Sequence, residues 1–365
     1  MTEQSPVLFQ ELPAGNDHTI AVATLNAPKA INSLNLTMAE LLYQQLLAWQ
    51  QDSKVAVVLL RGSGDKGFCA GGDVLQLRES SVNADDRARD FFTQEYRLDY
   101  LIHTYTKPIV VWGHGIVMGG GLGLMAGASH RVVTEKTRLA MPEITIGLYP
   151  DVGGSWFLNR MPGKVGLFLA LTGASINAAD TQFVGLADHA LNYSQWQAVL
   201  DKLQNSNWQQ CAFEQTSNVL LELQQQASDM PVSKVREQFD TINQLCTASS
   251  QEAILNNIIQ YNGQDEWLQK AAATLANGCP TTAKLVFEQL NKTKHLSLKE
   301  IFQLELIISC NCMRFGNFAE GVRALLVDKD KSPHFNPATL SEVTQEFVLA
   351  HFQAPWSGEN PLADL

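Results

Sequence analysis

The stretch HGIVMGGGLGLMAGASHRVVTEKTRLAMPEITIGLYPDVGG, from His114 to Gly154, sets the interpretation of the whole chain. It begins with a glycine cluster at residues 118–121, which opens into an apolar segment typical of a helix, residues 122–128. Two carboxylates, Glu143 and Asp151, follow on a segment interrupted by proline and glycine. A turn rich in N–H donors followed by two carboxylates indicates a site where negative charge develops on a carbonyl oxygen.

The bulk composition is that of an acidic globular protein. A chain of 365 residues can bury a large core and predicts two domains. Hydrophobic residues make up 45% of the chain and charged residues 17%, proportions that exclude a disordered protein. The formal net charge of −11 argues against nucleic acid or an anionic membrane as the main partner. A small anionic ligand held by local amides and lysines stays compatible with that charge.

The six cysteines are scattered along the chain, which predicts reduced thiols and a cytoplasmic protein rather than a disulfide framework. Cys310 and Cys312 form a CxC pair inside an apolar run, which is not the paired CxxC spacing of structural metal sites. The eight histidines show no ligand pattern either, so we expect no metal site.

The N-terminal residues lack a basic region followed by an apolar core, and the first arginine is Arg61. We therefore expect neither a secretory nor a mitochondrial targeting peptide. No apolar run approaches the roughly 18 residues that a membrane helix needs, so a membrane is not an expected partner.

Patterns of strand and helix alternate in the N-terminal half, which predicts an α/β class. Apolar runs of strand length lie at residues 7–9, 20–25, 55–60, 109–112, 131–133 and 139–141. Helical patterns lie at residues 73–77, 87–106, 163–171 and 178–184, and Thr37 with Glu40 predicts a capping box that starts another helix. From residue 206 the chain is rich in Gln, Glu, Leu and Ala, and residues 298–312 have the pattern of a buried helix. We therefore expect a core at residues 1–205 and a mostly helical region at residues 206–365.

The sequence from Gly62 to Gly67 matches the GxGxxG pattern of dinucleotide sites and directly follows a predicted strand. A dinucleotide site needs a helix that opens at these glycines, so that its first N–H groups face the pyrophosphate. Residues 68–73 continue instead as a predicted loop. We interpret the pattern as a turn.

Four blocks resemble the crotonase (enoyl-CoA hydratase/isomerase) superfamily and occur in its order. They are LNAPKAINSLN at residues 25–35, FCAGGD at 68–73, HGIVMGGGLGL at 114–124 and MPEITIGLYPDVGG at 141–154. The resemblance implies a spiral of ββα turns with two roughly perpendicular sheets and surrounding helices. Within the superfamily the chain is most similar to the 3-hydroxyisobutyryl-CoA hydrolases, for three reasons. Gly123 stands where hydratases carry a second Glu, Asp151 stands where they carry Gly, and residues 317–337 look like the hydrolases' C-terminal segment.

The resemblance implies hydrolysis of a 3-hydroxyacyl-CoA thioester, with 3-hydroxyisobutyryl-CoA of valine catabolism as the expected substrate. It implies an oxyanion hole formed by the N–H groups of Gly72 and Gly120, each worth roughly 3 kcal/mol to the tetrahedral intermediate. No cofactor is expected, because coenzyme A belongs to the substrate and product. Two alternatives stay open: a hydratase or isomerase, and a non-catalytic acyl-CoA-binding protein.

The predicted roles of the acidic residues come from the same resemblance. Glu143 acts either as general base for a water or as nucleophile, and both roles stay open. The alternative for Glu143 is a solvated loop carboxylate. Asp151 orients the 3-hydroxyl or shares proton transfer with Glu143 and the departing thiolate, although Asp also favours a helix N-cap. Glu95, in the segment FFTQEY, is expected to contact the substrate hydroxyl; the alternative is a solvated residue on a helix face.

The remaining predicted site residues match positions where the family binds its acyl-CoA substrate. For Lys29, the alternative is an ordinary surface lysine. They are Lys29, Ala30, Ile31, Ala70, Gly71, Asp73, Val74 and Gly119. We expect His114 to pack or hydrogen-bond rather than act as a base. Members of the superfamily commonly form trimers and hexamers, so a homo-oligomer is an open expectation. The long C-terminal extension could instead cover that interface.

Overall fold

The computed structural model describes residues 5–365 and divides the chain into two compact units that alternate along the sequence. Unit 1 contains the chain up to Gly72 together with Arg97–Leu139 and Ile176–Ser233. Unit 2 contains Asp73–Tyr96, Ala140–Ser175 and Lys234–Leu365. The predicted boundary after residue 205 falls inside a segment of unit 1, and the functional division at that position stays a prediction.

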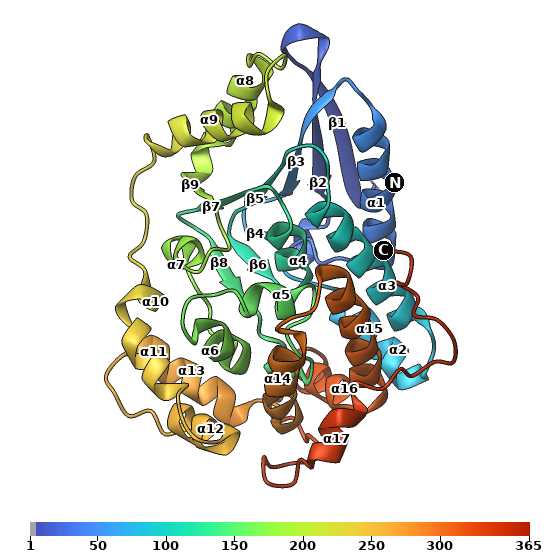
Figure 1. Cartoon of the computed structure of the whole chain (residues 1–365), viewed down its shortest axis with the longest axis vertical. Coiled ribbons are helices and arrows are strands. Elements are labelled where there is room, and N and C mark those ends of the chain that lie inside the picture. Colours follow the sequence, from blue (N-terminus) through green and yellow to red (C-terminus); the bar gives the residue numbers. More distant parts are fainter. Residues whose placement is uncertain (1–4) are drawn as a thin grey trace. The chain divides into compact units, whose positions relative to one another are not determined.

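Unit 1 is organised around a six-stranded sheet with the order β1-β2-β3-β5-β7-β9 (Figure 1). The pair β1 and β2 is antiparallel, and each later neighbour pairs in parallel. The strands are β1 Val7–Pro13, β2 Thr19–Leu25, β3 Val55–Gly62, β5 Ile109–Gly113, β7 His130–Thr134 and β9 His189–Leu191. A second sheet has the order β4-β6-β8, with β4 Gly67–Cys69, β6 Ile116–Met118 and β8 Arg138–Ala140.

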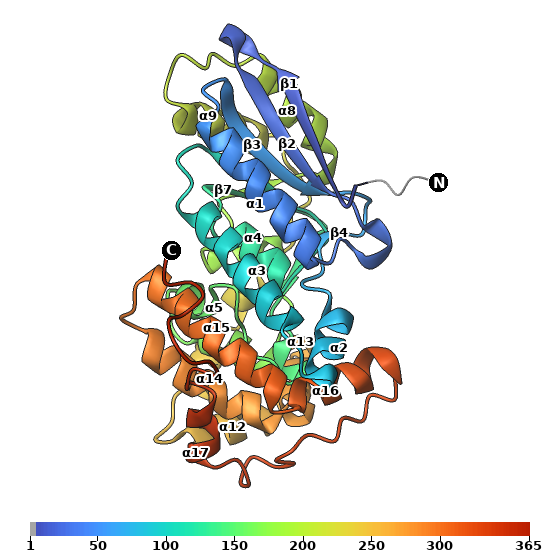
Figure 2. The same ribbon diagram turned by 90° about the vertical axis from the view of Figure 1, so that its right-hand side faces the viewer.

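The apolar run predicted as a buried strand is β3, whose residues from Val55 to Leu60 are all buried. One face of the sheet packs on α8 Trp196–Gln204 and α9 Ala212–Gln224, in a cluster that includes Trp112, Leu203 and Leu220. The helix α1 Leu36–Gln51 runs along β1, β2 and β3 (Figure 2). The sheet and these helices remove the apolar side chains of β3 from water, and this burial stabilises a strand that has no polar face.

Unit 2 is mostly helical. Its helices are α2 Val74–Asn83, α5 Gly154–Leu158, α6 Val165–Thr172, α10 Lys234–Glu237, α11 Phe239–Leu245, α12 Gln251–Ile259, α13 Glu266–Asn277, α14 Pro280–Thr293, α15 Leu298–Arg314, α16 Asn317–Val322 and α17 Gln345–Ala350. Short α4 Gly120–Ala126 and α7 Ala178–Phe183 belong to unit 1, and α3 Arg87–His103 contributes residues to both units. From residue 206 onward the chain forms helices and loops, which confirms the predicted fold class.

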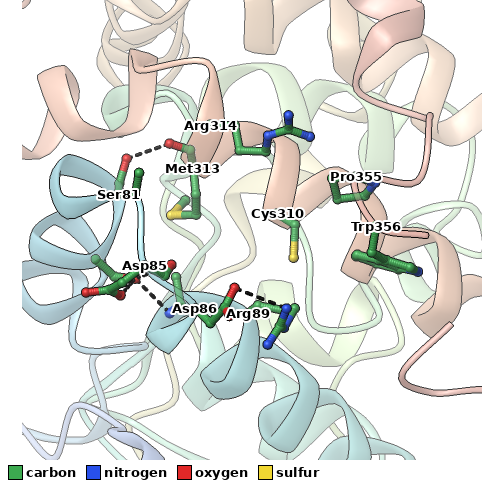
Figure 3. Close-up of a pocket in the computed structure, with 12 residues that line it drawn as sticks. Ser81, Asp85, Asp86, Arg89, Cys310, Met313, Arg314, Pro355 and Trp356 are labelled. Carbon is green, nitrogen blue, oxygen red and sulfur yellow. Dashed lines mark hydrogen bonds and ion pairs between the residues drawn. The ribbon is translucent and has the colours of Figure 1, made fainter. Parts of the chain in front are cut away.

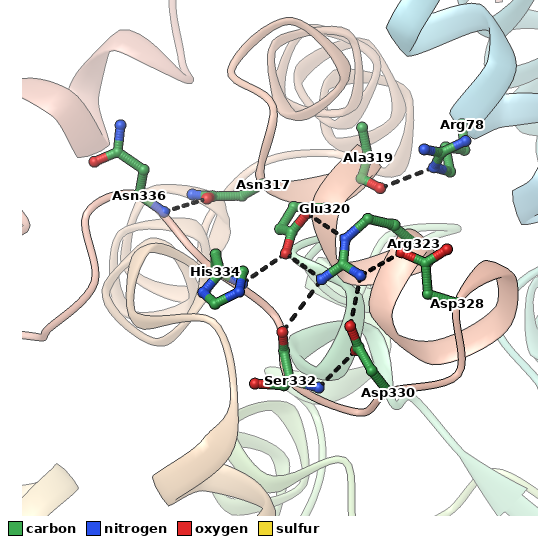
Figure 4. Close-up of polar contacts among 10 residues, drawn as sticks. All are labelled: Arg78, Asn317, Ala319, Glu320, Arg323, Asp328, Asp330, Ser332, His334 and Asn336. Carbon is green, nitrogen blue, oxygen red and sulfur yellow. Dashed lines mark hydrogen bonds and ion pairs between the residues drawn. The ribbon is translucent and has the colours of Figure 1, made fainter.

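The C-terminal segment at residues 317–337 is held together by one arginine (Figure 4). Arg323 donates to both carboxylate oxygens of Glu320, at 2.9 and 2.8 Å, and to Asp328 and Asp330 at 2.5 and 2.7 Å. The N–H of His334 donates to the same Glu320 carboxylate at 2.6 Å. The irregular residues 328–337 are thus tied to the helical residues 317–327 by charge-assisted hydrogen bonds.

One local prediction is corrected by the structure, and another agrees with it. The helix α1 is capped by Asn35, whose side chain accepts from the Met38 N–H, so the capping box predicted at Thr37 and Glu40 is wrong. Asparagine at this position already satisfies one free N–H of the first turn, and the helix begins two residues earlier than a Thr37 cap requires. The GxGxxG pattern forms a turn that leads into β4, as expected from the missing helix.

Between residues 5 and 365, no helix combines the length and apolarity that a bilayer crossing demands. The same residues contain no group of three His, Cys, Asp or Glu side chains that could hold a metal ion. All six cysteines are free thiols, and Cys211 is exposed while the others are buried.

Candidate active site

The glycine cluster forms a tight turn in unit 1, where two chain segments approach closely. An ideal Cβ added to Gly121 would lie 2.5 Å from the carbonyl oxygen of Cys69, so only glycine fits there. Gly71 has a φ of +105°, and a Cβ added to it would lie 3.7 Å from the Gly120 nitrogen. Residues 70–72 therefore run beside the start of α4. Because the first N–H groups of a helix have no partner within it, the Gly120 N–H can donate to a ligand.

The predicted coenzyme A contacts in unit 1 are connected by backbone hydrogen bonds. The Ala70 N–H donates to the Ile31 carbonyl at 3.0 Å, and the Leu34 N–H donates to Gly71 at 2.8 Å. Lys29 and Ala30 lie exposed in a short 3₁₀ turn, Pro28–Ala30. The structure brings residues 30–34 and 70–72 together, while Lys29 keeps both of its interpretations.

Two predicted coenzyme A contacts belong to unit 2. Asp73 is the N-cap of α2, and its carboxylate accepts from the N–H and the side-chain amide of Gln76, at 3.2 and 2.7 Å. Val74 is the first residue of that helix. Capping explains why Asp occupies position 73, whether or not a ligand binds there.

Glu143 begins a buried 3₁₀ turn, Glu143–Ile146, and its side chain is only 5% exposed. Its Oε2 atom has no hydrogen-bond partner among residues 5–365. Burial, and then the charge of Asp151, raise the pKa of Glu143 well above its usual range. A carboxylate in these surroundings is a strong base when ionised, which excludes the alternative of a solvated loop residue.

Asp151 is also buried, at 4% exposed, and burial raises its pKa to about 6. Its Oδ2 atom accepts a hydrogen bond of 2.6 Å from the hydroxyl of Tyr96 on α3. The alternative of a helix N-cap is wrong, because Gly153 caps α5. The side chain of Asp151 is therefore free of a capping role. Two buried carboxylates whose charges act on each other cannot both ionise readily, so the pair favours sharing one proton.

A chain of hydroxyls continues from Asp151. The Tyr96 hydroxyl lies 2.6 Å from Ser309 Oγ, which lies 3.0 Å from the Tyr149 hydroxyl. The Tyr149 hydroxyl donates to the backbone carbonyl of Glu305 at 2.8 Å. The chain therefore connects the carboxylate to the backbone of α15 within unit 2.

The loop that carries Asp151 is fastened to α14 and α15 from the other side. Glu305 accepts from the N–H groups of Gly153 and Ser155, at 2.8 and 3.0 Å. Gln289 donates to the Pro150 carbonyl at 2.6 Å and to Ser155 Oγ at 2.9 Å. Burial raises the pKa of Glu305 to about 8. Residues of the C-terminal region thus fix the backbone on both sides of Asp151.

Glu95 lies next to Tyr96 on α3 and is 2% exposed, so the alternative of a solvated helix face is wrong. Its charge acts on the Tyr96 hydroxyl and contributes to the raised pKa of that tyrosine, which burial dominates. Its contact with a substrate hydroxyl stays a prediction.

In unit 1, His114 is buried, lies 3.1 Å from the Gly64 carbonyl and packs on Tyr193, as expected for a structural histidine.

Sequence and structure comparisons bear directly on this geometry. A profile described as enoyl-CoA hydratase/isomerase matches residues 20–352. The chain belongs to the enoyl-CoA hydratase/isomerase family. The 3-hydroxyisobutyryl-CoA hydrolase of Danio rerio is 41% identical over 94% of this chain and 88% of its own length. The human protein of that name is 37% identical over 93% and 87%.

Solved structures agree on the fold of the family. The structure described as a carnitinyl-CoA dehydratase from Mycobacterium thermoresistibile has a TM-score of 0.88 and 35% identity, over 99% of this chain and all of that one. An enoyl-CoA hydratase from Rhodobacter sphaeroides has a TM-score of 0.82 and 28% identity, over 96% and 98%. The predicted crotonase-like fold is confirmed.

The prediction of a cytoplasmic protein is wrong. The hydrolase relatives from Danio rerio and Homo sapiens are named as mitochondrial proteins. Scattered reduced thiols fit any reducing compartment, so cysteine usage could not distinguish these locations. The prediction about a targeting peptide rested on the N-terminal residues, of which residues 1–4 lie outside those described.

The motif analysis assigned no role to the residues that hold Asp151 and its loop, which are Tyr96, Tyr149, Gln289, Glu305 and Ser309. Tyr96 and Tyr149 lie inside two quoted segments, and the other three lie outside all of them. One signal for them was present in the sequence. Glu305 interrupts the apolar face of a helix predicted to be buried, and a buried carboxylate needs partners. Its partners themselves could not be found, because they lie about 150 positions earlier in the chain.

Unit 2 also contains a cavity of about 440 Å³ that includes none of the predicted site residues (Figure 3). Its lining includes Arg89, Cys310, Arg314 and Trp356. Ser81 at its rim donates to the Met313 carbonyl at 2.6 Å, which joins α2 to α15. Burial raises the pKa of Cys310 to about 12, so this thiol is inert as a nucleophile.

Proposed function

We propose that this chain hydrolyses 3-hydroxyacyl-CoA thioesters, with 3-hydroxyisobutyryl-CoA as the substrate and 3-hydroxyisobutyrate and coenzyme A as the products. The observation that carries the proposal is the buried pair Glu143 and Asp151, in a chain about 40% identical to relatives named for this reaction. Such a hydrolase would serve valine catabolism.

The chemistry divides between two sets of groups. The N–H groups of Gly72 and Gly120 stabilise the oxyanion that forms on the thioester carbonyl. That oxyanion forms when Glu143 either activates a water that attacks the carbonyl carbon or attacks this carbon itself; in the second route a water then hydrolyses the mixed anhydride. Both routes need the ionised form of Glu143. Asp151 holds the proton that the departing thiolate requires. Glu95 contacts the 3-hydroxyl, and residues 29–31, 70–71 and 73–74 with Gly119 bind the coenzyme A part.

Coenzyme A enters this reaction only as part of the substrate. We propose that neither a metal nor a prosthetic group takes part, because two carboxylates and two amides supply a complete set of acid, base and oxyanion groups. Assembly into a homo-oligomer is a separate proposal, which rests on the habit of the superfamily.

A hydratase or dehydratase is the second candidate function, favoured by the dehydratase description of a structure with 35% identity. Gly123 argues against it. This residue is buried in α4 and provides no carboxylate where hydratases place their second Glu. Addition of water across a conjugated double bond needs both carboxylates, so we expect this chain to hydrate crotonyl-CoA far more slowly than it hydrolyses its thioester substrate.

The decisive experiment measures thiol release from 3-hydroxyisobutyryl-CoA by the wild type, Glu143→Gln and Asp151→Asn. We expect kcat to fall by about 10²–10⁴-fold in each variant, the range for loss of a general acid or base. Hydration of crotonyl-CoA is followed in parallel. If wild type and variants release thiol equally slowly while still binding the substrate, the chain is an acyl-CoA-binding protein. Efficient hydration without thiol release would favour the second candidate.

A further inference from the structure

The hydroxyl chain beside Asp151 contains fewer protons than contacts. Four contacts join its atoms in series: Asp151 to Tyr96, Tyr96 to Ser309, Ser309 to Tyr149, and Tyr149 to the Glu305 carbonyl. Only three hydroxyl protons are present. Burial keeps the pKa of both phenols well above the usual range, so each tyrosine brings one proton and no more. Each hydrogen bond needs a proton of its own, so the count matters.

With Asp151 ionised, one contact must lack a proton. Tyr149 must donate to the Glu305 carbonyl, which can only accept, and Tyr96 donates to the carboxylate. Ser309 then has one proton for two neighbours, at 2.6 and 3.0 Å. One pair of buried oxygens is left facing each other without a hydrogen between them. That arrangement leaves a buried polar contact unsatisfied, which disfavours the ionised form of Asp151.

With Asp151 protonated, every contact is satisfied. Its proton is donated to Tyr96, Tyr96 donates to Ser309, Ser309 donates to Tyr149, and Tyr149 donates to the Glu305 carbonyl. All four bonds then run in one direction, an arrangement in which neighbouring hydrogen bonds strengthen one another.

We propose that Tyr96, Ser309 and Tyr149 form a relay that draws the shared proton toward Asp151 and so favours an ionised Glu143. The proposal rests on the proposed function, in which Glu143 must be ionised and Asp151 must carry a proton for the thiolate. All three are positioning residues. They also give the C-terminal region a chemical role, because Ser309 and the terminal acceptor both belong to α15.

The other titratable groups around Asp151 add to this bias. They come from α3, from the turn before Asp151 and from α15, and they are Tyr96, Glu143, Tyr149, Glu305 and Cys312, with Glu95 acting on Tyr96. All of them are neutral or negative, so a charge on Asp151 is opposed by each one that ionises. Burial raises the pKa of Glu143 as well, and the relay opposes transfer of the proton to that partner.

The experiment titrates Asp151 directly by infrared spectroscopy. A Glu143→Gln background removes the coupled carboxyl, and the C=O band of protonated Asp151 is identified by its loss in Glu143→Gln/Asp151→Asn. In this background we expect Ser309→Ala and Tyr149→Phe each to lower the pKa of Asp151, by roughly half a unit to one unit. Each substitution removes the contact without a proton, so the ionised form loses its penalty.

The sign of the shift separates the relay from an ordinary donor chain. If Ser309 and Tyr149 only strengthened the donation from Tyr96 to the carboxylate, their removal would raise the pKa of Asp151 or leave it unchanged. Either of those outcomes overturns the proposal. In a further Tyr96→Phe background, which disconnects the relay from Asp151, both substitutions are expected to have no effect on this pKa. A shift that persists there also overturns it.

Tyr105→Phe is the matched control. The Tyr105 hydroxyl is buried and donates to the Leu46 carbonyl at 2.6 Å, outside the relay, so its loss should leave the Asp151 band unchanged. The titration needs no turnover. A chain that hydrolyses no thioester but shows the predicted pKa shifts would refute the proposed function and support the relay. An active hydrolase that lacks these shifts would support the proposed function and refute the relay.

Discussion

Asp151 shows how burial alone gives a carboxyl group a chemical task. A carboxylate removed from water loses its hydration, and this raises the pKa of Asp151 from its usual 3.8 to about 6. The hydrogen bond from Tyr96 opposes that shift but does not cancel it. A group that titrates near neutrality can both hold and release a proton during a reaction, which a solvated aspartate does poorly.

The raised pKa of Asp151 also predicts how stability depends on pH. Below about pH 4 the carboxyl is neutral in the folded and unfolded chains, and it costs nothing. As the pH rises through the folded value of about 6, ionisation favours the unfolded chain. We therefore expect Asp151→Asn to raise Tm above that of the wild type at pH 7, with a smaller difference at pH 4. Thermal unfolding monitored by circular dichroism over this pH range checks it.

Asp188→Asn is the control of opposite sign. Asp188 accepts from Arg131 at 2.9 and 2.7 Å, and these hydrogen bonds lower its pKa although burial opposes them. Its ionised form stabilises the folded chain above pH 4, and this stability is lost as the pH falls. The variant should therefore lose Tm at pH 7. If both variants shift Tm in the same direction at pH 7, the pKa shifts of Asp151 and Asp188 on folding do not govern the stability changes.

The helix α15 is the element that organises the loop of Asp151. Three of its groups face residues 149–155: the Glu305 carboxylate, the Glu305 carbonyl and the Ser309 hydroxyl. Gln289 on α14 adds two further hydrogen bonds to this loop. Because backbone N–H groups in a buried loop need acceptors, the loop depends on these two helices for its conformation.

Substitution of Glu305 tests this dependence. Glu305→Ala leaves the N–H groups of Gly153 and Ser155 buried without acceptors, at about 1–3 kcal/mol for each. We expect the free energy of unfolding to fall by about 2–5 kcal/mol, measured by urea denaturation. Activity should also fall, because the substitution releases the backbone beside Asp151.

Glu300→Ala is the matched control on the same helix. Glu300 lies exposed in the first turn, where its carboxylate accepts hydrogen bonds from the N–H and hydroxyl of Ser297. Its loss should reduce stability less and leave kcat unchanged. Equal losses in the two variants would mean that α15 acts only through its own helical stability.

At the scale of the whole molecule, both units are assembled from segments distant in sequence. Unit 2 combines residues 73–96 and 140–175 with the C-terminal helices, which pack on them. Phe168 on α6, for example, lies 5.6 Å from the ring of Trp267 on α13. Residues 140–175, which carry Glu143 and Asp151, therefore pack on helices that begin only at residue 234.

This arrangement predicts the behaviour of a shortened chain. A protein ending after residue 205 lacks Gln289, Glu305 and Ser309, so buried groups of residues 149–155 lose their partners. We expect it to show no cooperative thermal transition, whereas the full chain shows one. Differential scanning calorimetry of both chains checks this. A sharp transition with a large enthalpy in the shortened chain would contradict the dependence on the C-terminal helices.

The sequence alone determined those features that depend on neighbouring residues. The continuous apolar run at residues 55–60 predicted a buried strand, and residues 298–312 predicted a buried helix, which is α15. Four motif blocks were enough for the fold class and the family. The motif blocks also predicted Glu143 and Asp151 as site residues. Both side chains are buried and the charge of Asp151 acts on Glu143, which fits a catalytic pair. Their roles in the reaction stay predictions.

Only the tertiary structure decided how that pair is held. Tyr96 is separated from Asp151 by 55 positions and from Ser309 by 213, and neither separation leaves a periodic pattern in the sequence. The sequence also predicted the wrong cap for α1: asparagine and threonine are both favoured at N-caps, and the structure shows Asn35 in that position. Local patterns determine which elements form. The direction of a proton in a buried hydroxyl chain depends on contacts that exist only once those elements pack.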